Sequence, residues 1–203
     1  ATYPVDVIGV PSVDAALVWN EPATATYSSC APTALNVRVR NQGSSNLSSY
    51  SIALNVDGTN VNTYNGSTSI IAGDSLSIVL PAYQFTPGRH QVSASITVTG
   101  DTVTYNNTVS RVIPISFCGG TYTVGPNAQF ASMAAAIDTL NMVGMEGSVV
   151  FNIASGTYNG QAMVGAIAGA DSAHTVTFQS ATGNAADVVL TAVPTATDNY
   201  VLG

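Results

Sequence analysis

The sequence predicts a mainly β protein, an Ig-like β-sandwich followed by a helix-capped start of a right-handed parallel β-helix. Residues 1–116 contain about seven short strands with turn residues between them, which is the rhythm of a sandwich. Residues 117–203 contain one amphipathic helix and then short strands punctuated by glycine, which is typical of a solenoid that is beginning. We therefore place a domain boundary between residues 116 and 117, next to Cys118 and the hinge pair Gly119 and Gly120.

Alternation of apolar and polar residues predicts the strands of the first part. They are residues 13–19, 34–40, 50–56, 61–64, 75–80, 90–98 and 108–115. In the second of these, Val37 and Val39 alternate with Arg38 and Arg40, so we expect one buried and one solvated face. The Asp57-Gly58 pair predicts a tight hairpin.

The second part is predicted to begin with a helix over residues 130–141, capped by Ser132 and ended by Gly144. Its expected apolar face consists of Met133, Ala134, Ile137 and Leu140. Strands are expected at residues 148–153, 175–179 and 187–191, with residues 154–158 and 181–184 as separators. We expect the helix to cover one open end of the coil, because an unpaired edge would invite aggregation.

Composition argues for an exported protein. Of 203 residues, 46% are hydrophobic and 7% are charged. The chain has four arginines, no lysine and eleven acidic residues, which gives a net charge of −7. Nucleic acid and anionic membranes are therefore not expected as partners, and no apolar run is long enough for membrane insertion. A chain that starts at Ala1 without a leader is what signal-peptide cleavage leaves, although trimming gives the same start.

Cys30 and Cys118 are the two cysteines, and their spacing does not fit a zinc site. Two buried free thiols or one disulfide are both compatible with the spacing. The extracellular composition favours the disulfide, which would stabilise the fold by roughly 4 kcal/mol on the chain-entropy model.

Two family resemblances follow from longer motifs. NVRVRNQG at residues 36–43, AGDS at 72–75 and YNNTV at 105–109 resemble the CARDB-type domain, an Ig-like module of bacterial surface proteins associated with adhesion. GTYTVG at 120–125, the helix, GSVVFNIASGTY at 147–158 and VTFQSATG at 176–183 resemble the β-helix opening of large secreted Bacteroidetes proteins. That resemblance implies type IX secretion, although no sorting domain of that type is visible.

Four Asp-(Ser/Thr)-apolar triplets resemble the O-glycosylation acceptor of the same phylum. Their hydroxyl residues are Ser75, Thr102, Thr139 and Ser172. Ordinary turn and cap chemistry is the alternative, and it is strongest for Thr139 because that residue lies in the predicted helix. Ser75 and Thr102 are the preferred acceptors.

Enzymatic chemistry finds little support in the sequence. Lyases with a β-helix need clustered acids with an Arg or Lys, and neither basic residue occurs after Arg111. The acids of the second part are scattered; they are Asp138, Glu146, Asp171, Asp187 and Asp198. A glycosidase pair of Asp171 and Asp187, and a base formed by His174 with Asp171, are weaker hypotheses than ordinary turns.

Two binding hypotheses are also weaker than their structural alternatives. Trp19, Tyr3, Tyr27, Tyr50 and Tyr64 could form a sugar-binding platform, but aromatics in sandwich strands usually pack in the core. Asp57 and Asp101 could bind calcium, but hydrated turns are more common. We expect no catalytic residue, no metal and no cofactor.

The sequence therefore predicts a non-catalytic spacer, docking and binding module of a large adhesin-like protein at the bacterial cell surface. Its expected partners are other parts of the same long chain or neighbouring surface chains. Polysaccharide is a further candidate ligand. One alternative is a filament subunit that assembles by β-strand pairing. The other is a carbohydrate-active enzyme whose active coils lie after Gly203, since the resemblance covers barely one coil.

Overall fold

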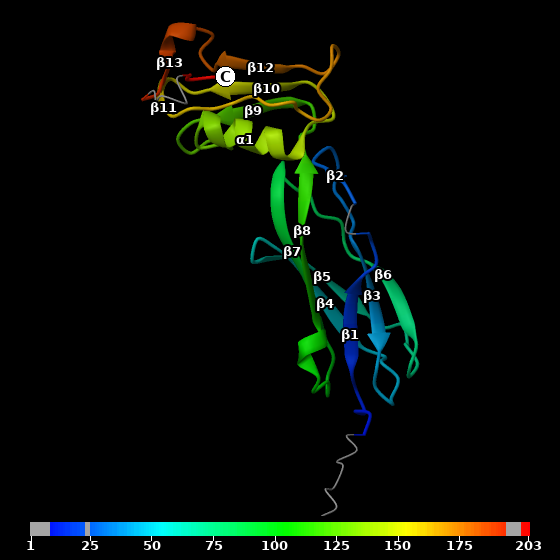
Figure 1. Ribbon diagram of the computed structural model, residues 1–203. Helices are drawn as coiled ribbons and strands as arrows, with labels where there is room; N and C mark the ends of the chain where they lie inside the picture. Colours follow the sequence, from blue (N-terminus) through cyan, green and yellow to red (C-terminus); the bar gives the residue numbers. More distant parts are fainter. Residues whose placement is uncertain (1–8, 23–24, 194–199) are drawn as a thin grey trace, which may run out of the picture. The chain divides into compact units, whose positions relative to one another are not determined.

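The structure is a computed structural model that describes residues 9–22, 25–193 and 200–203 (Figure 1). The chain forms two compact units, which are described separately. The first consists of the residues up to Ala25, Thr33–Tyr83 and His90–Ile113, and the second of Thr26–Pro32, Gln84–Arg89 and Pro114–Gly203. Tyr3 and Asp198, which the sequence singled out, lie outside the described residues.

One sheet of the first unit is antiparallel, with the order β1-β3-β6. It consists of β1 (Ala15–Trp19), β3 (Asn36–Asn41) and β6 (Ser75–Val79). Val39 of β3 pairs with Leu17 and Leu76. Val37 and Val39 are buried while Arg38 and Arg40 are exposed, which confirms the half-buried strand predicted from the alternation.

A larger sheet, most of whose residues belong to the first unit, has the order β2-β8-β7-β4-β5. Its strands are β2 (Tyr27–Ser28), β4 (Tyr50–Val56), β5 (Thr59–Gly66), β7 (Gly88–Thr97) and β8 (Thr108–Ser116), with the short 3-10 helix η1 (Thr104–Asn106) between the last two. The predicted hairpin is present, since Asp57 and Gly58 take φ values of 50° and 82° between β4 and β5. Residues from both sheets are fully buried, including Val37, Ile52 and Leu54. The unit is mainly β and consistent with an Ig-like sandwich.

The second unit contains a parallel sheet of order β12-β10-β9. Its strands are β9 (Gly120–Val124), β10 (Val149–Ile153) and β12 (Val176–Ser180). Val149 of β10 pairs with Gly120 on one side and with Val176 on the other. β10 and β12 lie within a residue of the predicted strands, whereas β9 falls in a segment for which no strand was predicted.

A second parallel pair consists of β11 (Gly156–Asn159) and β13 (Val188–Thr191), which follows the short 3-10 helix η2 (Ala185–Asp187). An isolated parallel bridge also joins Ala162 to Leu202. The prediction that residues 154–158 only separate strands is wrong, because β11 begins at Gly156. This strand has no apolar alternation of its own, and it forms through its pairing with β13.

The helix α1 (Met133–Val143) confirms the predicted cap, since the Ser132 side chain accepts from the Ala135 N–H. Gly144, with φ 69°, ends the helix as predicted. The helix starts later than expected, because Phe130 instead bridges to Val124. Its buried residues are Met133, Ala136, Ile137 and Leu140, so Ala136 takes the buried position that was assigned to Ala134.

These residues join the strands in one hydrophobic core, centred on Phe117, Tyr122 and Phe151. Ile153 also belongs to this core, and only 4% of the residue is exposed. Phe178 and Leu190 are half-buried and pack against the border of the core. The parallel β-helix itself stays a prediction.

Candidate functional site

An aromatic ladder crosses the three parallel strands. Tyr122, Phe151 and Phe178 are register partners on β9, β10 and β12. The ring centroid of Phe151 lies 6.2 Å from that of Tyr122 and 5.3 Å from that of Phe178. Phe151 is fully buried, whereas Phe178 is only half-buried. Among the described residues, the ladder therefore has rings on both sides of Phe151 and on one side of Phe178.

A polar ladder occupies the neighbouring register position. Asn152 of β10 pairs with Thr123 and Gln179, and the Gln179 Nε2 donates to Asn152 Oδ1 at 2.6 Å. Within the part of the chain that the structure describes, β12 pairs with β10 alone. The outer edge of β12 therefore presents backbone N–H and C=O groups and a row of side chains to a further strand. Their arrangement is the same as the one that β10 presents to β12.

The opposite end of the sheet is covered. Figure 1 shows α1 on the β9 side of the sheet, away from β12, and Met133, Ile137 and Leu140 of α1 share a core with Tyr122 and Val124 of β9. A helix packed on this end blocks further pairing there. The two ends of the sheet thus differ, since one is closed by α1 and the other ends at the β12 edge.

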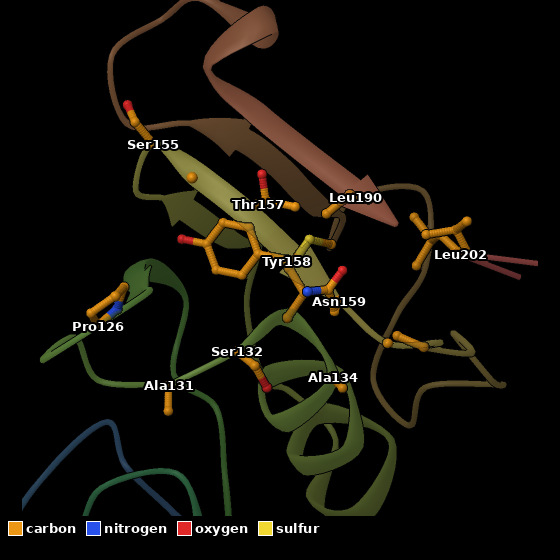
Figure 2. A pocket seen from close by; sticks show the side chains of 15 residues that line it. Pro126, Ala131, Ser132, Ala134, Ser155, Thr157, Tyr158, Asn159, Leu190 and Leu202 are labelled. Carbon is orange, nitrogen blue, oxygen red and sulfur yellow. The ribbon is translucent and has the colours of Figure 1, made fainter. Parts of the chain in front are cut away.

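A pocket of about 440 Å³ lies between β11 and the first turn of α1 (Figure 2). Figure 2 shows Tyr158 near the middle of the view, with Ser132, the N-cap of α1, and Ala134 on one side and Thr157 on the other. Its described lining contains no charged residue. Several polar groups are already engaged, since Tyr158 donates to the Ala154 carbonyl at 2.8 Å and Thr191 bonds to Asn159. The pocket is a neutral hollow without a set of metal ligands.

Cys30 and Cys118 are joined in a disulfide, with their Cα atoms 4.8 Å apart. Both belong to the second unit. The Cys118 N–H donates to Ser29 Oγ at 2.9 Å, and the Cys118 carbonyl accepts from the Tyr122 hydroxyl at 2.7 Å. Burial raises the pKa of Tyr122 above its ordinary value. The disulfide thus lies between β2 and the start of β9, and both backbone groups of Cys118 are hydrogen-bonded.

The four candidate glycan acceptors are not equivalent. Ser75, Thr102 and Ser172 are exposed, and Ser75 begins β6 directly after a turn. Thr139 is half-buried on α1, and its hydroxyl donates to the Ala135 carbonyl at 2.7 Å. A transferase needs an accessible hydroxyl, so the geometry favours the first three over Thr139.

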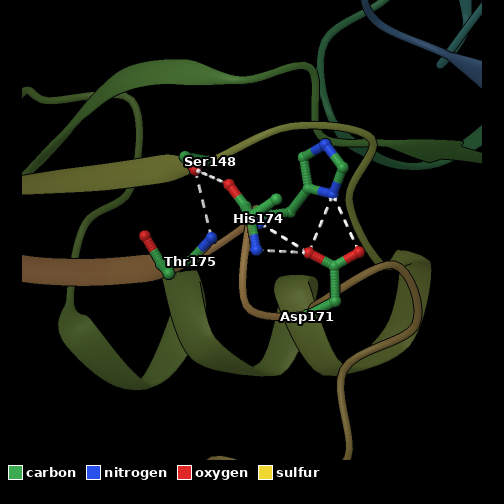
Figure 3. Close-up of polar contacts among 5 residues, drawn as sticks. Ser148, Asp171, His174 and Thr175 are labelled. Carbon is green, nitrogen blue, oxygen red and sulfur yellow. Dashed lines mark hydrogen bonds and ion pairs between the residues drawn. The ribbon is translucent and has the colours of Figure 1, made fainter.

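Asp171 and His174 form a turn before β12 (Figure 3). Asp171 Oδ1 accepts from the N–H groups of Ala173 and His174, both at 2.7 Å, and His174 Nδ1 lies 3.2 Å from Asp171 Oδ2. The backbone bonds from His174 and Ala173 are the main reason why the pKa of the Asp171 carboxyl lies below its ordinary value. Ser148 does not face the imidazole as a nucleophile would, because its hydroxyl donates to the Ala173 carbonyl at 3.1 Å.

The other acids that the sequence singled out also stabilise loops. Asp187 accepts from Thr182 Oγ1 at 2.6 Å and from Asn184 Nδ2 at 2.9 Å. Asp57 lies 2.6 Å from His90 Nδ1 and accepts from Gln91 N, while Asp101 accepts from the N–H groups of Ala15 and Val103. Among residues 9–22, 25–193 and 200–203, no three His, Cys, Asp or Glu residues gather in a group able to hold a metal ion.

Sequence patterns missed the surroundings of Trp19. The Arg111 guanidinium carbon lies 4.5 Å from the centre of the Trp19 ring, and Arg111 also pairs with Glu21. One face of the indole is thus covered by a cation. Tyr50, another aromatic residue of the hypothetical sugar-binding platform, is buried. These residues are distant in sequence, so only the fold brings them together. No described helix is both long enough and apolar enough to span a bilayer.

No family model and no curated protein matches the chain. Solved structures match about half of it. The CARDB domain of a Pyrococcus furiosus protein in complex with di-metal ions is 14% identical, with 52% of this chain and 94% of that chain covered and a TM-score of 0.41. A domain of a proposed cell surface protein from Methanosarcina acetivorans is 18% identical, with 53% and 93% covered and a TM-score of 0.42. A solution structure of the Pyrococcus domain is 13% identical, with 53% and 97% covered and a TM-score of 0.39.

Proposed function

We propose that this chain is a non-catalytic module of an extracellular or cell-surface protein, and that its second unit begins a parallel β-helix that serves as a scaffold. The observation that carries the proposal is the ladder of Tyr122, Phe151 and Phe178, which stops at a half-buried ring. Solenoids stack like residues on like residues, and each coil is completed by its neighbour.

The order of the pairings supports the same proposal. β9, β10 and β12 pair in parallel, then β11 with β13, then Ala162 with Leu202. Each later segment of the chain lies beside the corresponding earlier one, as expected for a chain that winds into successive coils. The β12 edge is where the next coil would pair, because α1 occupies the other end.

The proposed location rests on composition and on the disulfide. Disulfides persist in oxidising compartments, and the Cys30–Cys118 bond fits an exported protein. A charge content of 7% without lysine fits a surface solvated by hydroxyl and amide groups. On the sequence resemblance alone, we assign the module to a large adhesin-like protein that Bacteroidetes export by type IX secretion.

Limited proteolysis of intact cells of the native source tests this location. We expect a protease that does not enter the cells to release peptides of this chain, as it does for a known surface protein. A known intracellular protein of the same cells is the negative control. Peptides of this chain that are seen only after lysis would refute the surface location.

A filament subunit is the second candidate, and it is favoured by the outer edge of β12, which has no partner strand in the part of the chain that the structure describes. In that case the edge would pair with a strand of another copy. Light scattering after size-exclusion chromatography at increasing protein concentrations separates the two functions. Concentration-dependent growth of the mass supports the filament, whereas a constant monomer mass supports the scaffold.

A further inference from the structure

A carboxylate is held beside the disulfide by the backbone of the second unit. The Glu146 N–H donates to the Phe117 carbonyl at 2.9 Å, and Phe117 bridges in parallel to Met145. Phe117 directly precedes Cys118 in the chain. Gly147 follows Glu146, and a Cβ built on Gly147 would lie only 3.0 Å from the Gly119 Cα. The two segments are therefore in close backbone contact, which fixes the origin of the Glu146 side chain.

The side chain of Glu146 reaches the disulfide itself. Its Oε1 accepts from Ser116 Oγ at 3.0 Å, and its Oε2 lies 3.6 Å from Cys30 Sγ. Cys30 is exposed to solvent and Cys118 is half-buried. The more exposed of the two cysteines is thus the one whose sulfur lies beside the carboxylate.

Reduction of a disulfide starts with a thiolate. The thiolate attacks Cys30 Sγ, the Cys30–Cys118 bond breaks, and Cys118 leaves as a thiolate. A second thiolate of the reagent then attacks the mixed disulfide, which releases Cys30 and a disulfide of the reagent. Negative charge accumulates on the sulfurs during the first attack, so a fixed carboxylate a few ångströms away raises its barrier.

We propose that Glu146 is an electrostatic guard that slows attack on the Cys30–Cys118 disulfide by anionic thiols. When a thiol reagent carries a second negative group, Glu146 repels both its thiolate and that second group. A thiol with an ammonium group is partly compensated, because the ammonium is attracted to Glu146. The guard therefore selects among reductants by their charge, which an apolar neighbour would not do.

The charge of the whole protein must be separated from the effect of Glu146. The net charge of −7 also repels anions, and removal of any acid weakens that repulsion. Asp138 offers a matched control, because it is an exposed acid on α1 in the same unit. Asp138→Asn and Glu146→Gln each remove one negative charge. The amide oxygen that Glu146→Gln introduces could still accept from Ser116.

The experiment measures reduction of the complete folded chain by 2-mercaptoethanesulfonate and by cysteamine, at low salt. Samples are trapped with an alkylating reagent and weighed by mass spectrometry. Each thiol is compared with itself across the variants, so its own pKa cancels. For Glu146→Gln, we expect the sulfonate rate to rise roughly fivefold and the cysteamine rate to change less or fall. Asp138→Asn should leave both rates within about twofold of the wild type.

Three outcomes would overturn the proposal. The first is an equal acceleration of both thiols in Glu146→Gln, which would indicate loosened structure. The second is an equal effect of Asp138→Asn, which would indicate overall charge. The third is a rate independent of thiol concentration, because reduction would then follow opening of the fold. If Glu146→Gln folds poorly, wild-type protein in rising salt decides, since a guard requires the sulfonate rate to increase more steeply than the cysteamine rate.

Discussion

Phe151 and Phe178 stack with ring centroids 5.3 Å apart and an interplanar angle of 14°, and they are register partners on adjacent parallel strands. Phe151 also contacts Tyr122 on its other side. A ring between two others is removed from water on both faces, whereas the outer ring is covered on one. The difference in burial within one ladder makes the two phenylalanines a matched pair for mutation.

We predict that Phe151→Ala destabilises the second unit by about 3–5 kcal/mol, because it leaves a cavity in a closed core. Phe178→Ala should cost about 1–2 kcal/mol, because its half-exposed ring contributes less transfer free energy. Hydrogen exchange of the β10 amides measures both, with an exposed position such as Asp138→Asn as control. An equal cost for the two substitutions would show that Phe178 is as well covered as Phe151.

The sequence predicts an element of this structure well where the residues that determine it are close together in the chain. Ser132 and Gly144 lie at the ends of α1 as predicted, because capping depends on residues close in sequence. β11 was missed because its residues pair only with β13, far along the chain. The surroundings of the disulfide are harder to predict from the sequence than the strands are. Glu146 was considered only as one of several scattered acids, and its position beside Cys30 arises from the fold.

We predict that the intact protein contains no thiol available for alkylation unless it is first reduced. Mass spectrometry with and without reductant measures this directly. A Cys30→Ser, Cys118→Ser double variant should lose about 2–5 kcal/mol, since the cross-link constrains the unfolded chain. Two alkylated cysteines in unreduced protein would contradict the disulfide.

For glycosylation, we predict modification at one or more of Ser75, Thr102 and Ser172 in protein from the native source, and none at Thr139. The first three are exposed, whereas Thr139 is half-buried and bonded to its own helix. Peptide mass spectrometry reads each site, and protein expressed in a host without the transferase is the control. Unmodified masses for all four peptides would reject the glycan hypothesis.

The turn before β12 should weaken in acid. The pKa of Asp171 is lower in the folded protein than its ordinary value, so its ionised form stabilises the fold. That contribution is complete above about pH 4 and is lost as the pH falls through the lowered folded pKa. An NMR titration of the Asp171 carboxyl measures the shift. In the wild type, protection of the Ala173 and His174 amides from hydrogen exchange should decrease as Asp171 is protonated. In Asp171→Asn this decrease should be absent, and a decrease that remains would have to come from another group.

The last prediction concerns the unpaired side of β12. If the sheet is a stack that another coil completes, its strands cannot be equally protected, because solenoid stability is a sum over neighbouring contacts. β10 has partners on both sides, whereas β12 has β10 alone within the described residues. We therefore expect the amides of Val149–Ile153 to exchange at least tenfold more slowly than those of Val176–Ser180, a difference of about 1.4 kcal/mol in local opening. Hydrogen exchange on the complete chain measures both strands at once, and β9, which is covered by α1, is the internal control. A version of the protein that includes one further coil should slow exchange in β12 and leave β9 unchanged. If β12 is already as protected as β10 in the chain alone, its edge needs no further strand, and the proposal that a β-helix continues from it fails.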